Sequence, residues 1–147
     1  MQNIVQADYQ LYRRWFERSL DVIWRMPSDL PPEADPMAGV ANAEAASAAT
    51  GVKSVAAGIT DTISMTDRYS KADIESADAQ FKREGLPTLT AMRALFSKRT
   101  RAILKSGKVT NEEDYYALKA VEDAELADST RAEIERLLAE YESGLSS

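Results

Sequence analysis

Hydrophobic and polar positions follow a helical period along most of this chain. From Asn3 to Met26, polar side chains recur at steps of three and four residues and leave a broad apolar face opposite them. We therefore expect residues 1–26 to form an amphipathic helix. The segment holds five of the chain's eleven aromatic residues, which are candidate partner-binding residues: Tyr9, Tyr12, Trp15, Phe16 and Trp24. Such a face packs into a core, docks into a partner's groove or lies on an interface.

A proline-rich connector follows at residues 27–36. Each proline lacks a backbone donor and disfavours helical geometry in the residue before it, so the first helix should end near Met26. The four prolines are Pro27, Pro31, Pro32 and Pro36. No two of them are three positions apart, which argues against a PxxP ligand.

Residues 37–69 are rich in alanine, serine, threonine and glycine, yet their larger apolar residues keep a thin helical stripe. Gly51 and Gly58 lie seven positions apart, a spacing that would allow another helix to approach closely. We expect a helix here in preference to a flexible linker, which stays open as the alternative. Its narrow face would pack against the aromatic face of the first helix or against another copy of the chain.

Residues 70–147 are predicted to form a C-terminal helical unit. Ser70 begins a capping box, and Gly85 ends that helix. The next helix is expected from Thr88 or Thr90 to about Lys105, another from a capping box at Thr110, and the last from near Asp128. The predicted fold is all-α: a small bundle of about five helices, with an antiparallel C-terminal three-helix unit and an N-terminal aromatic amphipathic helix.

The charges of the C-terminal half are segregated. Six bases and no acid lie between Leu86 and Asn111, whereas eleven acids and three bases lie between Glu112 and Glu142. We interpret the two groups as neutralising each other across a helical hairpin and complementing the helix dipoles. The alternative is a basic surface for nucleic acid, although acids on the following helix would repel phosphates. Its candidate residues are Arg93, Lys98, Arg101, Lys105 and Lys108.

Arg99 breaks the helical wheel of this segment. If one helix runs from Thr88 to Lys105, the apolar side chains of Met92, Leu95 and Ile103 bracket Arg99. A buried unpaired guanidinium is too costly, so Arg99 should either extend to solvent or meet a carboxylate of the neighbouring helix. We expect it to be a structural charge, and Arg101 to lie on the outward side.

Composition limits the chemistry. The chain has 147 residues, enough for one domain, and it contains neither cysteine nor histidine. Imidazole bases, thiol nucleophiles and metal sites built from those ligands are therefore excluded. The lone glycine of Ser106-Gly107-Lys108 does not make a phosphate-binding loop. Carboxylate, lysine or tyrosine catalysis stays possible, but no spacing of the acids indicates it. We expect no catalytic, cofactor-binding or metal-binding residue.

Residues 1–10 have neither a basic stretch nor an apolar run, so we expect no signal peptide and a cytoplasmic location. The net charge of −6 opposes general attraction to nucleic acid or anionic membranes. The sequence favours a non-enzymatic protein–protein interaction module, an adaptor, regulator or assembly subunit, that self-associates. The alternatives are a nucleic-acid-associated regulator using residues 93–108, or a lipid- or polymer-surface binder using the first helix. A small-molecule ligand stays an open question.

Overall fold

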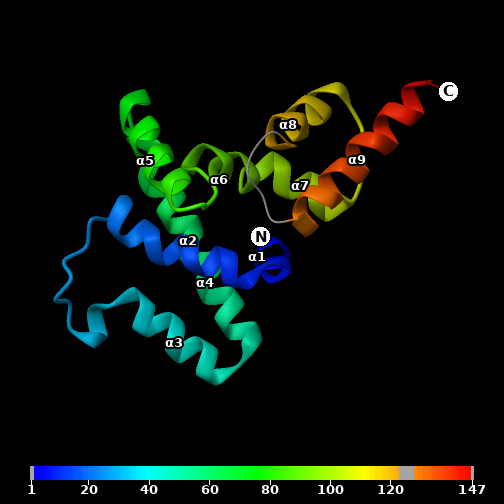
Figure 1. The fold of residues 1–147 in the computed structure, drawn as a ribbon. Coiled ribbons are helices and arrows are strands. Elements are labelled where there is room, and N and C mark those ends of the chain that lie inside the picture. Colours follow the sequence, from blue (N-terminus) through cyan, green and yellow to red (C-terminus); the bar gives the residue numbers. More distant parts are fainter. Residues whose placement is uncertain (1, 123–127, 147) are drawn as a thin grey trace.

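The computed structural model describes residues 2–122 and 128–146. Within these ranges all regular structure is helical, so the predicted all-α class is confirmed (Figure 1). There are nine α-helices and two 3-10 helices in the described residues. In chain order they are α1 (Gln2–Ala7), α2 (Tyr9–Val22), η1 (Pro32–Ala34), α3 (Pro36–Ala46), α4 (Ala48–Met65), η2 (Thr66–Arg68), α5 (Lys71–Arg83), α6 (Leu89–Leu95), α7 (Lys98–Ser106), α8 (Glu112–Glu122) and α9 (Asp128–Ser146).

Three segments that the sequence predicts as single helices are each divided by a capping residue. The side chains of Asp8, Ser47 and Ser97 accept hydrogen bonds from backbone amides three residues ahead, and so begin α2, α4 and α7. Short polar side chains compete for the backbone in this way, which ends one helix and starts the next. For this reason the described chain has nine helices where about five were expected.

The other predicted helix boundaries mostly agree with the structure. Ser70 and Asp73 form the expected reciprocal capping box, and Gly85 and Gly107 follow α5 and α7 with φ angles of 71° and 70°. The predicted box at Thr110 is wrong. The side chain of Asn111 instead accepts a hydrogen bond from the amide of Asp114, at 2.8 Å, and begins α8.

Helix α2 lies at the centre of the molecule, between α4 and α5, and α1 reaches both α4 and α9. The crossing of α2 and α4 is close because Gly58 has no side chain. A Cβ atom at Gly58 would lie 2.6 Å from the ring of Phe16, and one at Gly51 would lie 3.1 Å from the Tyr9 hydroxyl. The small-residue face of α4 therefore packs against the aromatic helix, as the spacing of its glycines predicts.

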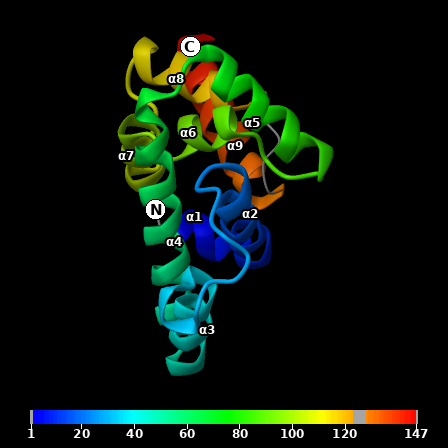
Figure 2. The same cartoon turned by 90° about the vertical axis from the view of Figure 1, so that its left-hand side faces the viewer.

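The α3 helix and the first turns of α4 extend away from the rest of the chain as a hairpin (Figure 2). Val40 is the only residue of α3 that is fully buried. At the opposite end, α6, α7, α8 and α9 pack in succession, and the C-terminal turns of α9 project beyond them (Figure 1). The buried core lies between these two ends.

Candidate functional site

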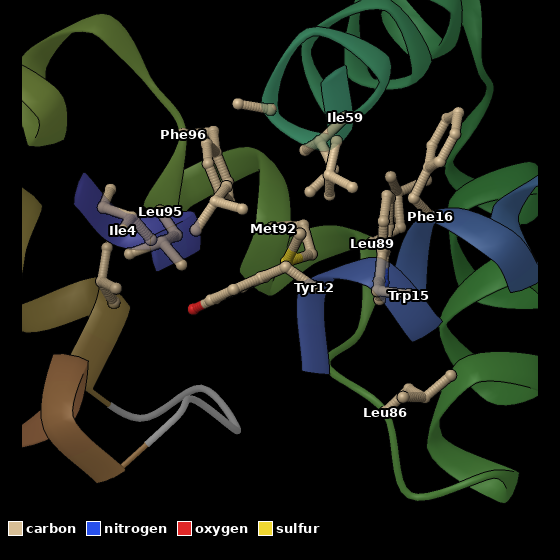
Figure 3. Packing of buried hydrophobic residues seen from close by; sticks show 14 of the residues in the cluster. Ile4, Tyr12, Trp15, Phe16, Ile59, Leu86, Leu89, Met92, Leu95 and Phe96 are labelled. Carbon is tan, nitrogen blue, oxygen red and sulfur yellow. The ribbon is translucent and has the colours of Figure 1, made fainter. Parts of the chain in front are cut away.

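The aromatic face of α2 is covered by the chain itself. Tyr12 and Trp15 are 0% exposed and Phe16 is 6% exposed, and all three point into the core (Figure 3). The indole of Trp15 stacks on Phe81 and donates a hydrogen bond to the Pro87 carbonyl at 2.9 Å. These contacts agree with the core interpretation of this face. A partner would reach the three side chains only by displacing the helices that cover them.

The other two candidate aromatics, Tyr9 and Trp24, are half-buried at the edges of this core. Tyr9 donates a hydrogen bond to Glu44 at 2.8 Å, and Arg13 binds the same carboxylate through Nε at 3.0 Å. Trp24 donates to the hydroxyl of Thr62 at 2.9 Å. Both polar groups are thus used within the chain, where they attach α3 to α2 and α4 to the segment that follows α2.

These environments raise the pKa values of two tyrosine hydroxyls, those of Tyr9 and Tyr12. Burial, followed by the Glu44 carboxylate, raises the pKa of Tyr9 to about 12, while the Arg13 guanidinium lowers the pKa of Glu44. Burial also raises the pKa of Tyr12 to about 12. The Tyr12 hydroxyl has no hydrogen-bond partner of good geometry among the described residues, although Thr130 lies close enough to oppose the shift.

An open cleft of about 310 Å³ lies between the turn after α7 and the C-terminal part of α9. Along α9, the apolar stripe passes from buried Leu137 through half-buried Tyr141 to Leu145, which is 69% exposed. The apolar stripe of α9 therefore extends beyond the residues that pack over it, and its last side chain is exposed. The cleft is lined by Lys108, Val109, Leu137, Glu140, Tyr141, Gly144 and Leu145.

Helix α8 closes the other side of Tyr141. The ring centroids of Tyr115 and Tyr141 are 5.1 Å apart, and the Tyr115 hydroxyl donates a hydrogen bond to Glu142. That hydrogen bond raises the pKa of Tyr115. The exposed ring of Tyr116 lies edge-on to Tyr115 at 5.4 Å. Three tyrosines, Tyr115, Tyr116 and Tyr141, thus lie together at this end of the molecule. The four-residue spacing of the apolar side chains along α9 was visible in the sequence, but the exposure of Leu145 was not.

The basic candidates are distributed over two helices and a turn. Arg93 lies on α6, Lys108 lies in the turn after α7, and the other three candidates, Lys98, Arg101 and Lys105, share α7. The five make no ion pair with any residue that the structure describes, whereas Arg99 does. The acids Asp123 and Glu125 lie outside the described residues. Across the described hairpin, the predicted neutralisation is therefore confined to one of the six bases.

The predicted wheel for Arg99 and Arg101 is wrong, because the break at Ser97 changes the register of the helix. Arg99 is 49% exposed and lies 3.4 Å from Glu113 and 3.6 Å from Asp114, so the expected pairing with α8 is present but at the surface. Arg101, expected to face outward, is half-buried instead. Its Nε is buried and lacks a hydrogen-bond partner among the described residues.

The described residues include no group of three or more acids placed to hold a metal ion, and none of their helices is long and apolar enough to cross a membrane. No family model matches the chain, and no curated protein or solved structure is significantly similar to it. Two surfaces of the described residues are the strongest candidates for binding a partner: the α9 cleft and the bases of α7.

Proposed function

We propose that this chain is a non-enzymatic, cytoplasmic protein–protein interaction module that self-associates through the α9 cleft. The observation that carries the proposal is Leu145, a large apolar side chain that is 69% exposed beside a cleft with an apolar lining. An amphipathic helix that leaves part of its apolar stripe exposed is suited to docking into an apolar groove of a partner. The buried α2 face does not supply such a surface.

A second copy of the chain is the occupant that fits best. The cleft carries one base, Lys108, and one acid, Glu140, so it is complementary to itself in a twofold arrangement. The last turn of α9 contains no basic residue, and a cation near this end would interact favourably with the helix dipole. In a twofold dimer, Lys108 of one copy would complement that end, and Leu145 would enter the partner's cleft.

Light scattering after size-exclusion chromatography tests this proposal. At tens of micromolar, the parent chain should have a mass above that of the monomer, and Leu145→Glu should restore the monomer. The matched control is Ala139→Glu, which adds the same charge at an exposed position of the same helix. Ala139→Glu should keep the parent's mass.

Two results would contradict the proposal. A monomeric parent at the highest concentration tested would rule out self-association. A parent dimer that both variants leave intact would place the contact on another surface. Because Leu145 is exposed, its replacement should not unfold the chain, and unchanged circular dichroism of the variant verifies this.

A further inference from the structure

The bases of α7 are not neutralised by the fold. In the described part of the chain, Lys98, Arg101 and Lys105 make no ion pair. At about 100° per residue, the three lie within about 60° of each other on the helix, and Arg99 lies about 100–160° from them, toward α8. Helix α7 therefore has two charged sides, one paired with α8 and one left free.

The N-terminal end of α7 is electrostatically unfavourable for the isolated chain. Lys98 and Arg99 occupy the first turn of α7, which contains no acid, so two cations face the positive end of the helix dipole. This differs from the sequence-based expectation, in which the bases would lie toward the end of a longer helix. An anion bound beside Lys98 would interact favourably with both the side chain and the helix end.

Arg101 adds a second observation on the same side. Its Nε is buried without a hydrogen-bond partner among the described residues, which is unfavourable for a donor. Burial of Nε fixes the position of the guanidinium on this side of α7. A guanidinium that is held in place presents its remaining donors as a planar fork, which matches a phosphate or carboxylate.

We propose that the free side of α7 binds the phosphodiester backbone of a nucleic acid. Lys98, Arg101 and Lys105 form a row about 10 Å long, at 1.5 Å per residue, and a nucleic-acid strand supplies negative charges in a regular row. No acid lies between residues 86 and 111, so no acid of α6, α7 or their adjoining turns competes for this row. The competing partner is an acidic protein surface. No feature of α7 favours the carboxylates of such a surface over the regularly spaced phosphates of a nucleic acid.

The rest of the molecule sets the character of this binding. The net charge of −6 and the acidic first turn of α8 restrict contact to a few phosphates. Binding should therefore be weak, independent of base sequence and steeply dependent on salt. It does not require the α9 cleft, so this inference and the proposed self-association succeed or fail separately.

Fluorescence anisotropy with a labelled 20-nucleotide single strand and the corresponding duplex, each from 20 to 150 mM salt, tests the inference. The variant is Lys98→Gln with Lys105→Gln, and both side chains are exposed. Its control is Lys53→Gln with Lys71→Gln, which removes the same charge at exposed positions on α4 and α5. Loss of two phosphate contacts should lower the slope of log K against log salt by about 1.4 for the strand or about 1.8 for the duplex.

The comparison of strand with duplex identifies which form of nucleic acid the surface prefers, and binding of either form with the expected slope change supports the proposal. Three outcomes would overturn it: no binding of either probe at 20 mM salt, equal weakening by the two double variants, or binding of poly-glutamate as tight as that of the oligonucleotides.

Discussion

The substitution of glycine by alanine tests how closely α2 and α4 pack. The added methyl group should lower the stability of the chain at Gly58 and raise it at Gly39. In an open helix position, alanine is more favourable than glycine by about 1 kcal/mol. Gly39, on α3, is such a position: a Cβ there would have no heavy atom within 4 Å. Gly39→Ala should therefore stabilise the chain by up to about 1 kcal/mol.

At Gly58 the same change meets the Phe16 ring, whose two nearest atoms would lie 2.6 Å from the new Cβ. Real Cβ atoms do not approach so closely, so either the ring or α4 must move. Overpacking of this kind costs about 1–3 kcal/mol, which exceeds the propensity gain. We expect Gly58→Ala to be destabilising, with a difference of about 1–3 kcal/mol between the two variants.

Urea denaturation of the two alanine variants, followed by tryptophan fluorescence, measures this difference. Adding Phe16→Leu to Gly58→Ala should recover part of the loss, because the leucine side chain is smaller than the ring that blocks the Cβ. The double-mutant cycle should thus give a favourable coupling energy between the two sites. If Gly58→Ala stabilised the chain as much as Gly39→Ala, the close α2–α4 crossing would be refuted.

Three further predictions follow from the contacts of single side chains. Trp15→Phe should destabilise by about 1–3 kcal/mol in urea melts, because a buried backbone carbonyl loses its donor; a loss below about 0.5 kcal/mol would contradict the buried hydrogen bond. The raised pKa values of Tyr9 and Tyr12, about 12 against an ordinary 10, mean that both favour folding below pH 10 and that this contribution is lost as the pH rises to about 12; ultraviolet titration of the folded chain should show Tyr9 and Tyr12 ionising well above pH 10. Arg99→Ala should cost less than about 1 kcal/mol because its ion pairs are exposed, whereas Arg101→Met should be neutral or stabilising because it removes an unsatisfied donor; in chemical melts, a loss above about 1 kcal/mol for Arg99→Ala would support the original wheel, and a clear loss for Arg101→Met would contradict the unsatisfied donor.

The helical class and the pairing of the glycine face of α4 with the aromatic face of α2 could be predicted from the sequence. Both depend on periodicity and residue size, which are local properties of the chain. The three capping breaks were harder to predict, since a serine or aspartate inside an apolar pattern either caps a new helix or points to solvent. Ser47 and Ser97 do the former, and tertiary packing decides between the two.

The candidate surfaces were predictable only in part. The six bases were visible, but the break at Ser97 decides which of them share a side and places Lys98 at a helix start instead of inside a longer helix. Similarly, the stripe from Leu137 to Leu145 was visible, but only the packed structure shows where its cover stops. Exposure is a property of all the elements together, so a single helix does not reveal it.

The contact between α1 and α9 has a consequence for how the chain is made. A ribosome that adds about 5–20 residues per second completes α9 roughly 7–28 s after α1 has been synthesised. During that interval the N-terminal helices lack their last partner, and the tyrosine at position 12 stays open on the side that α9 later closes. A nascent chain of this protein therefore carries uncovered aromatic side chains for seconds, which makes its early helices a natural substrate for chaperones that bind during translation.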